Sequence, residues 1–451
     1  MTPQKVEENV TPHFGITRLK SDLHYDPAST PISIHFDQVT PANVLQSFPE
    51  ASTIRENNLF RDVEAFIGRH FGSQDVVKET NYCDKITLNG ATYTKLAYHF
   101  ASSYEKQVCF AMVHTWWWVL DDLIYTCALK STMGKMEIID TIEKFIETGG
   151  NQEETLQACS DPLLRSILAS HAEFDAKLGG IVSDYSKVKH RFTKGLRLYL
   201  QSNAWALMDS NLAGYSFDSF LHWRNISCGA TGSNELLMLL ENGNPPKYML
   251  DHVIVKTLLD TTTTLFAIRN DIVGVRRDLA RNDTGGTVMY KIRVEGKSPD
   301  VAVQEMLSLH DKVTRDYIQL RKTVLTMFKN SGQDDFYKLR NYIELLERYG
   351  YAVTFFYFTT PRDGPETDTL SDPYLYVRVQ VARKGSGEHG CSRTTGYVED
   401  SYNPVFHEVY TYHYAFGEHL DFTVWEKEPA LMPDKVGVLI YGCLYSIAKI
   451  N

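Results

Sequence analysis

The sequence predicts an all-α helical bundle followed by a small all-β sandwich at the C-terminus. From about residue 50 to residue 350, apolar side chains recur three or four positions apart, as around residues 96–119, which is the spacing of amphipathic helices. Beyond that region, residues 374–381 (YLYVRVQV), 409–414 and 420–424 alternate with period two. That alternation is typical of half-buried strands.

Composition divides the chain into a polar tail (1–30), a helical domain (31–363) and a β domain (364–451). The second boundary falls between residues 350 and 370, because residues 360–373 (TPRDGPETDTLSDP) have the Pro, Gly, Asp and Thr content of a linker. Within the helical domain, residues 253–278 contain few helix breakers, so we expect one long helix there.

The overall composition excludes several classes of protein. The chain has 451 residues, 43% of them hydrophobic, and a formal net charge of -10. This favours a large folded core and argues against nucleic acid as the main partner, because phosphate contacts need Lys and Arg. The longest apolar stretch is shorter than the ~20 residues that span a bilayer. With a polar start and seven scattered cysteines that form no CxxC pair, we expect a cytoplasmic protein with reduced thiols.

Two adjacent carboxylates follow an aromatic run in WWWVLDDLIYT, namely Asp121 and Asp122. Burying both in an apolar helix is costly unless they are compensated. A divalent metal is one compensation, and Mg²⁺ shared between carboxylates and a substrate phosphate suits such oxygen ligands. The alternative is a helix that turns its polar edge to water.

A second acidic pattern lies in residues 267–281 (AIRNDIVGVRRDLAR). Asn270, Gly274 and Asp278 are spaced four apart and would share one helix face. That face would offer a side-chain carbonyl and a carboxylate to one ion, with Gly274 leaving room for water. Arg277, next to Asp278, would donate to a phosphate oxygen. The alternative is a solvated face with ordinary charge pairs.

Together these motifs resemble those of the class I terpene cyclase (terpene synthase) family. That family carries DDxx(D/E) and, downstream, NDxx(S/T/G)xx(R/K)(E/D). Asp121 and Asp122 match the start of the first motif, and residues 270–278 match the second throughout. The resemblance covers about residues 50–363 and implies the class I terpenoid synthase helical bundle, with a C2-like sandwich after it.

Other positions fit the resemblance. Arg224 stands 46 residues before Asn270, where the family keeps a diphosphate-sensing arginine, and Gly229 falls near the family's helix break. In the region of the family's last helix, 342–363, Phe356 precedes Arg362 by six residues. The resemblance implies that Trp117, Trp118 and Phe356 line the substrate pocket, and at most one of the two tryptophans is expected to face it well.

Three positions depart from the family pattern. Tyr125 replaces the third acidic residue of the first motif, Asp363 replaces a tyrosine, and Asp278 replaces the commoner Glu. Metal binding would then rest chiefly on Asp121, with Asp122 accepting hydrogen bonds behind it.

The resemblance implies an enzyme that ionises an acyclic prenyl diphosphate, farnesyl or geranylgeranyl, and cyclises the carbocation to a terpene hydrocarbon or alcohol. It implies three Mg²⁺ ions, two near Asp121 and one on Asn270 and Asp278. Arg224, Arg277 and Arg362 would hold the diphosphate. A chain-elongating prenyl diphosphate synthase is disfavoured because it needs two DDxxD motifs and one partial copy is present.

The C-terminal region resembles a C2 domain in its SDPY, NPVF and WEKEPALMPDKVG segments. The resemblance implies Ca²⁺ ligands in acidic loops, namely Asp368, Asp372, Asp400, Glu426, Glu428 and Asp434. Bound Ca²⁺ would bring peripheral contact with anionic membranes. The alternative is a Ca²⁺-independent module used for packing. Because the module is short, we expect it to pack tightly on the helical domain.

Two further features of the sequence have alternative interpretations. GSGEHG (385–390) has the form GxGxxG, but strand-like sequence follows it, which favours a hairpin turn over a nucleotide site. The competing function from another class is a Ca²⁺-dependent lipid-binding protein on a degenerate terpenoid synthase scaffold, which the replacement at Tyr125 keeps open.

Overall fold

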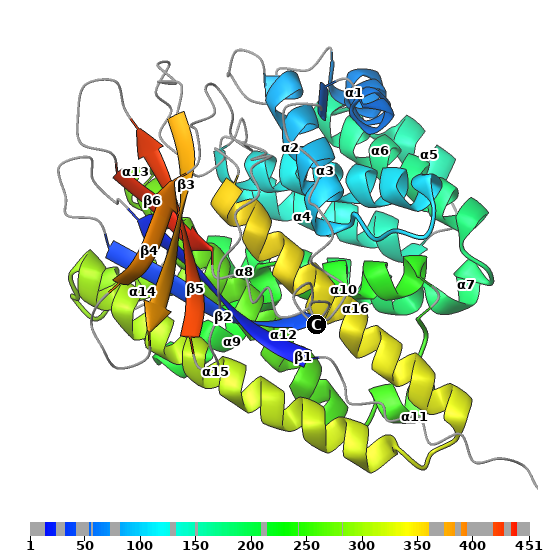
Figure 1. Cartoon of the computed structure of the whole chain (residues 1–451). Helices are drawn as coiled ribbons and strands as arrows, with labels where there is room; N and C mark the ends of the chain where they lie inside the picture. The colour runs from blue at the N-terminus through cyan, green and yellow to red at the C-terminus, as the bar shows by residue number, and fades with distance from the viewer. Residues whose placement is uncertain are drawn as a thin grey trace, which may run out of the picture.

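In the computed structural model, the chain forms a bundle of α-helices with β-strands on one side (Figure 1). The structure describes residues 14–23, 32–41, 54–55, 57–72, 82–126, 132–148, 152–208, 214–241, 243–281, 283–359, 374–383, 389–394, 418–427 and 434–439.

The first half of the bundle contains α1 (Asn58–Phe71), α2 (Tyr82–Ala97), α3 (Tyr104–Thr126), α4 (Thr132–Thr148), α5 (Gln152–Ala158), α6 (Pro162–Ile181), α7 (Tyr185–Val188) and α8 (His190–Met208). The second half contains α9 (Phe217–Ser227), α10 (Ala230–Leu240), α11 (Lys247–Leu250), α12 (Val253–Val273), α13 (Val275–Arg281), α14 (Thr287–Arg293), α15 (Pro299–Phe328) and α16 (Gln333–Thr359). The predicted helical pattern from about residue 50 to residue 350 is therefore confirmed, whereas residues 32–41, which the domain was also expected to include, form a strand.

The expected single helix over residues 253–278 is interrupted at Gly274, which separates α12 from α13. Glycine has a low helix propensity, so a helix end at this position costs little. The backbone hydrogen bonds from Gly274 N to Asn270 O (2.8 Å) and from Asp278 N to Gly274 O (3.0 Å) keep the two helices nearly continuous. The motif thus spans a helix junction rather than a helix interior.

The β-strands form two antiparallel sheets. At the N-terminus, β1 (Phe14–Leu23) pairs with β2 (Ile32–Pro41) in a register that sets Leu19 opposite Phe36. The C-terminal sheet has the order β4-β3-β5-β6. Its strands are β3 (Tyr374–Arg383), β4 (His389–Thr394), β5 (Glu418–Lys427) and β6 (Asp434–Leu439). β3 and β4 pair antiparallel, and the predicted turn at GSGEHG between them lies mostly outside the described residues. The predicted strand at 409–414 lies outside the described residues.

The predicted polar tail is wrong for residues 14–23, which form β1. These residues pair along their length with β2, and strand pairing satisfies backbone groups that a free tail would leave to water. On β2, Ile32, Ile34 and Phe36 are buried, following the two-residue period by which a strand presents one face to a core. They pack with residues of α12, α14 and α15, so β2 is part of the helical core.

The N-terminal strands also connect the bundle to the C-terminal sheet. β2 contacts α15 and α16, while β1 contacts β6 (Figure 1). The C-terminal sheet is therefore connected to the bundle through the N-terminal strand pair, and its tight packing on the helices themselves stays a prediction.

Two smaller observations complete the fold. In the part of the chain that the structure describes, no helix is both long and apolar enough to cross a membrane. The cysteines whose side chains are described, Cys83, Cys109, Cys159 and Cys228, form no disulfide with one another.

Candidate active site

A cavity of about 800 Å³ opens among helices α2, α3, α8, α9, α10, α12, α13 and α16. Both predicted motifs reach it, because α3 carries the aspartate pair and the α12–α13 junction carries the second motif. The predicted site residues that line the cavity are Asp121, Asp122, Arg224, Asn270, Arg277, Asp278, Trp117, Trp118 and Phe356. Residues from position 117 to position 356 of the chain thus share one site.

The aspartate pair on α3 is held by two tyrosines. The Tyr199 hydroxyl donates to Asp121 Oδ1 at 2.5 Å, and the Tyr82 hydroxyl donates to Asp122 Oδ2 at 2.8 Å. Each bond leaves further lone pairs on its carboxylate for a cation. The two donors come from α8 and α2, at sequence separations of 78 and 40 residues, so no local sequence signal identified them.

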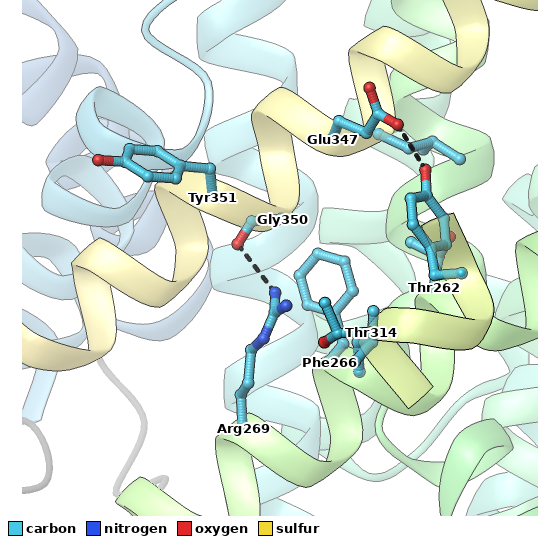
Figure 2. A pocket seen from close by; sticks show the side chains of 10 residues that line it. Thr262, Phe266, Arg269, Thr314, Glu347, Gly350 and Tyr351 are labelled. Carbon is cyan, nitrogen blue, oxygen red and sulfur yellow. Dashed lines mark hydrogen bonds between the residues drawn. The ribbon is translucent and has the colours of Figure 1, made fainter. Parts of the chain in front are cut away.

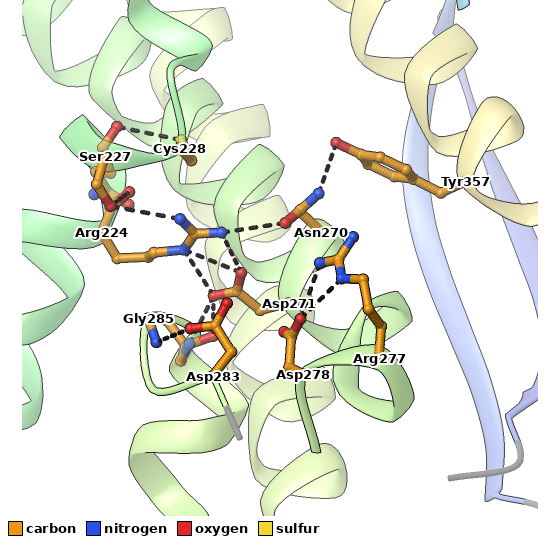
Figure 3. A network of polar contacts seen from close by, with 12 residues as sticks. Arg224, Ser227, Cys228, Asn270, Asp271, Arg277, Asp278, Asp283, Gly285 and Tyr357 are labelled. Carbon is orange, nitrogen blue, oxygen red and sulfur yellow. Dashed lines mark hydrogen bonds and ion pairs between the residues drawn. The ribbon is translucent and has the colours of Figure 1, made fainter. Parts of the chain in front are cut away.

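Arg224 on α9 is tied to the second motif (Figure 3). Its Nη2 donates to Asp271 Oδ1 at 2.6 Å and to Asn270 Oδ1 at 3.1 Å, and its Nε donates to Asp271 Oδ1 at 3.0 Å. Although burial opposes it, the Asp271 carboxylate raises the pKa of Arg224 above its ordinary value. The guanidinium is therefore a fixed positive charge at the cavity wall.

Asp271 is itself almost fully buried and does not line the cavity. Besides Arg224, it accepts from Thr287 N at 2.6 Å and from Thr287 Oγ1 at 2.9 Å. A carboxylate with this many donors is firmly oriented. Within the motif, Asp271 thus positions Arg224, a role that spacing alone did not reveal.

Asp278 faces the cavity beside Arg277, which donates to Asp278 Oδ1 from Nε (3.0 Å) and from Nη2 (2.9 Å). Burial, together with the Asp271 and Asp283 carboxylates, raises the pKa of Asp278 to about 6 although Arg277 opposes this. A buried carboxylate that gathers negative neighbours gains from a bound cation. These residues therefore fit a divalent ion.

Gly274 lies behind these groups and does not line the cavity. A Cβ at this position would stand 2.8 Å from Arg277 Nη2 and 3.0 Å from Asn270 O. The space that we expected Gly274 to leave for water is thus next to the Arg277 guanidinium. Among the described side chains, no three acidic, histidine or cysteine groups form a preassembled metal site, so an ion would be shared between the two walls and the substrate.

Comparison with known proteins identifies the family. Residues 112–316, which contain both motifs, match the family described as "Terpene synthase family 2, C-terminal metal binding". This part of the helical region is therefore similar to the metal-binding domain of terpene synthases. Residues 360–443 match the C2 domain family. Both predicted resemblances are confirmed.

A curated relative and several solved structures agree with this. "Microbial Terpene synthase-like protein 1" of Selaginella moellendorffii is 21% identical over 232 residues, which are 51% of this chain and 65% of that protein's length. A variant of the SVS_A2 protein from ancestral sequence reconstruction has a TM-score of 0.56 at 16% identity, over 72% of this chain and 90% of that one.

Two further structures are similar at low identity. Wild-type cucumene synthase has a TM-score of 0.53 at 12% identity, over 70% of this chain and 98% of its own. Linalool/nerolidol synthase from Streptomyces clavuligerus has a TM-score of 0.55 at 13% identity, over 70% and 98%. At these identities the likeness establishes the terpene synthase fold alone.

Both predicted tryptophans line the cavity, so the expectation that at most one faces it is wrong. Trp118 packs edge-on against Tyr93 with ring centroids 5.2 Å apart. Trp117 lies 5.0 Å from the Tyr199 ring and against the start of α10. Large indole rings on adjacent residues both reach a cavity that several helices surround, even though their Cβ atoms point about 100° apart.

The predicted helix break at Gly229 is confirmed, because this residue separates α9 from α10 with φ of 73°. Only glycine adopts this left-handed conformation without strain. A Cβ here would also stand 2.9 Å from Trp117 Cζ2. The break therefore gives the Trp117 ring its place in the cavity wall.

We expect Gly229→Ala to lower the free energy of unfolding by about 2 kcal/mol, because it combines left-handed strain with a clash on Trp117. Thermal or denaturant unfolding measures this. The matched control is Gly68→Ala inside α1, where a Cβ meets nothing within 4 Å, and we expect that change to be neutral or stabilising. Equal unfolding free energies in the two variants would contradict the role of Gly229.

A second, much smaller cavity of about 30 Å³ lies between α12, α15 and α16 (Figure 2). Buried Arg269 borders it, donating from Nε to His310 Nε2 at 2.9 Å and from Nη1 to Gly350 O at 3.5 Å. The volume suits a single water molecule and excludes a prenyl chain. Arg269 thus joins α12 to α15 and α16 directly beside Asn270. Of the two cavities, the large one has room for a prenyl chain.

Several predicted residues lie outside the described part of the chain, namely Arg362, Asp363, Asp368, Asp372, Asp400 and Glu428. In the C-terminal sheet, Glu426 on β5 and Asp434 on β6 are register partners. The two acidic positions are therefore brought side by side at one end of the sheet. Their side chains also lie outside the description.

Proposed function

We propose that the protein is a Mg²⁺-dependent terpene cyclase that ionises farnesyl or geranylgeranyl diphosphate and cyclises the carbocation to a terpene hydrocarbon or alcohol, releasing diphosphate. One observation carries the proposal. Both acidic motifs and Arg224 border a single cavity of about 800 Å³ whose other walls are largely aromatic. A charged rim suits a diphosphate, and an aromatic interior suits a prenyl chain.

In this proposal Asp121, Asp122, Asn270 and Asp278 hold the metal, with three Mg²⁺ ions expected from the family resemblance. When bound, these ions supply positive charge that stabilises the departing diphosphate. The carbonyl and carboxylate oxygens at the two motifs are the hard ligands that Mg²⁺ prefers.

Arginines complete the diphosphate site. Arg224 and Arg277 line the cavity, and their guanidinium groups are oriented by Asp271 and Asp278. Such fixed donors stabilise charge as it develops on the leaving group without reorganising. We assign the same role to Arg362 from the family resemblance.

The aromatic interior protects and stabilises the cation. Trp117 and Phe356 are buried, Trp118 is partly buried, and all three border the cavity. An aromatic face stabilises a nearby cation by ~0.5–2 kcal/mol, and rings that fill the wall leave less room for the water that would quench it.

Incubation with the C10, C15 and C20 prenyl diphosphates and Mg²⁺ tests the proposal. We expect release of diphosphate and a terpene hydrocarbon or alcohol identified by mass spectrometry, with farnesyl or geranylgeranyl diphosphate preferred. Chelation of Mg²⁺ should abolish the reaction. Absence of any terpene product from all three substrates would overturn the assignment.

For the C2 region we propose Ca²⁺-dependent contact with anionic lipid surfaces. The family match over residues 360–443 and the pairing of Glu426 with Asp434 support it, because Ca²⁺ needs several converging oxygen ligands.

We expect Asp434→Ala to weaken Ca²⁺-dependent association with phosphatidylserine liposomes roughly tenfold or more, as loss of a metal-site carboxylate does. Cosedimentation in Ca²⁺ and in chelator measures this, with Asp300→Ala at the start of α15 as a control carboxylate far from the sheet in sequence. Wild-type binding that is equal in Ca²⁺ and chelator would remove the metal role and favour a packing module.

A further inference from the structure

A polar cluster lies at the inner end of the aromatic cavity, away from the acidic motifs. It consists of His114 on α3, Ser233 on α10, Tyr349 on α16 and Tyr93 on α2, all of which line the cavity. Each of these residues is more than nine-tenths buried. Polar groups are costly inside an apolar wall unless they are hydrogen-bonded, and these residues meet that condition through a connected set of hydrogen bonds.

Two helices independently place the cluster deep in the cavity. His114 precedes Asp121 by seven residues on α3, which is two helical turns or ~10 Å. Tyr349 precedes Tyr357 by eight residues on α16, and the Tyr357 hydroxyl accepts from Asn270 Nδ2 at 3.2 Å. The cluster is therefore about two turns below both acidic motifs, where the far part of a prenyl chain would lie when its diphosphate is at the rim.

The hydrogen bonds of His114 define its tautomer. Nδ1 lies 2.9 Å from the Phe110 carbonyl oxygen, which can only accept, so Nδ1 carries the proton. Nε2 is then the basic nitrogen of a neutral imidazole, and it accepts from the Ser233 hydroxyl at 3.0 Å. The Ser233 side chain also interacts with the Tyr349 hydroxyl, and Tyr349 is hydrogen-bonded to Tyr93.

Burial lowers the pKa of His114 to about 4, so the imidazole is neutral at physiological pH. A neutral base does not repel an approaching cation, and even a weak base removes a proton readily from a carbon next to a carbocation centre. The same low pKa favours return of that proton to water once the product leaves.

We propose that Ser233 and His114 form the base that ends the reaction by removing a proton from the carbocation. This inference rests on the proposed function. In this step a C–H bond next to the cationic carbon breaks, and its electron pair forms the C=C bond of the product. The proton passes to the Ser233 oxygen while the hydroxyl proton of Ser233 moves to His114 Nε2. The imidazolium keeps its Nδ1–H bond to Phe110 and later releases a proton to water.

The position of the base in the cavity predicts the class of product. Because the base lies far from the diphosphate, it acts on a cation whose charge has moved to the inner end of the cavity. The expected main product is therefore a hydrocarbon formed by late proton loss, rather than one formed by proton loss beside the leaving group.

The test compares Ser233→Ala with Ser170→Ala, an equally conservative change at a buried position of α6 whose hydroxyl donates to Ser166 O at 2.7 Å. Each protein is incubated with farnesyl and geranylgeranyl diphosphate and Mg²⁺. Diphosphate release and the product pattern are measured separately. We expect release in Ser233→Ala to stay within about threefold of wild type, while the share of the main hydrocarbon falls about tenfold or more. Ser170→Ala should match wild type in both.

A second variant, His114→Ala, tests whether the product depends on the basic nitrogen of His114 or only on the volume of its ring. His114→Ala should lose the main hydrocarbon similarly, and added imidazole should restore it, whereas thiophene, a ring of similar size without a basic nitrogen, should not. Restoration by both rings would overturn the proposal, because ring volume alone would then matter. If His114→Ala does not fold, the Ser233 comparison decides.

The outcomes of these experiments distinguish failure of the proposed base from failure of the proposed cyclase function. A wild-type protein that releases diphosphate, with an unchanged product pattern in Ser233→Ala, would overturn the base and leave the cyclase function intact. A wild-type protein that releases no diphosphate from either substrate would overturn the cyclase function and the base with it.

Discussion

Asn270→Ala is expected to lower kcat by roughly 10²–10³-fold while the protein stays folded, a loss comparable to that of a key charge-stabilising group. Asn270 has two separate contacts at the cavity wall. Its Oδ1 accepts from Arg224 Nη2 at 3.1 Å, and its Nδ2 donates to the Tyr357 hydroxyl at 3.2 Å. Alanine removes the proposed metal ligand and also frees one edge of the Arg224 guanidinium.

The measurement is steady-state release of diphosphate at several Mg²⁺ concentrations, with thermal unfolding as the check on folding. Tyr357→Phe is the matched control, because it removes only the hydroxyl that accepts from Asn270. For that change we expect a smaller loss, about tenfold, as for partners that orient a metal ligand. Full turnover in Asn270→Ala would contradict metal binding by the second motif.

Asn270→Ala also separates a terpene cyclase from a lipid-binding protein on a degenerate scaffold. Asn270 is on α12, whereas the C2 region begins beyond α16. Liposome association should therefore persist in Asn270→Ala. If the chain were a lipid-binding protein on a degenerate scaffold, wild type and variant would bind liposomes equally and neither would release diphosphate.

The sequence predicted the cavity-lining motifs well because their positions follow from helical spacing. Asp121 and Asp122 occupy one helix end, and the residues of the second motif recur at multiples of about one turn, so local geometry alone brings each set to one wall. That the two walls face each other came from the family resemblance. The structure places both on one cavity.

Hydrogen-bond partners that come from distant helices could not be predicted from the sequence. Tyr82 and Tyr199 bond the aspartate pair from α2 and α8, and Ser233 meets His114 across a separation of 119 residues. No spacing rule links such residues, because their contact depends on how whole helices pack. The break at Gly274 was also missed, since one glycine in an otherwise regular pattern is compatible with either continuation or a junction.

The prediction of a polar tail was wrong for a different reason. Residues 14–23 contain charged and apolar side chains without a strong pattern, and only pairing with β2 gives them strand structure. Strand formation here depends on a neighbouring strand and on the helical surface beneath it, which is the dependence on context that limits β propensity. The contact between β1 and β6 was also not predicted, because residues 14–23 were expected to belong to a polar tail.

Phe36→Ala on β2 is expected to lower the free energy of unfolding of the helical domain by about 3–5 kcal/mol, the cost of removing a buried aromatic ring. Phe36 is fully buried, lies 5.0 Å from the His310 ring, and packs in one cluster with Ile268 and Ile272 of α12. Those two residues flank Asn270, so β2 supports the helix that presents the second motif.

Met327→Ala near the end of α15 is the control, because Met327 is 49% exposed and its loss should change stability by only about 0.5 kcal/mol. Denaturant unfolding measures the free energy of unfolding of both variants.

A chain that starts at residue 43, and so lacks both N-terminal strands, should be destabilised at least as much as Phe36→Ala. It should also need more Mg²⁺ for half-maximal turnover, because α12 loses its packing partner. An unchanged unfolding midpoint in the shortened chain would mean that the N-terminal strands are dispensable for the bundle and that the support of α12 comes from α15 and α16 alone.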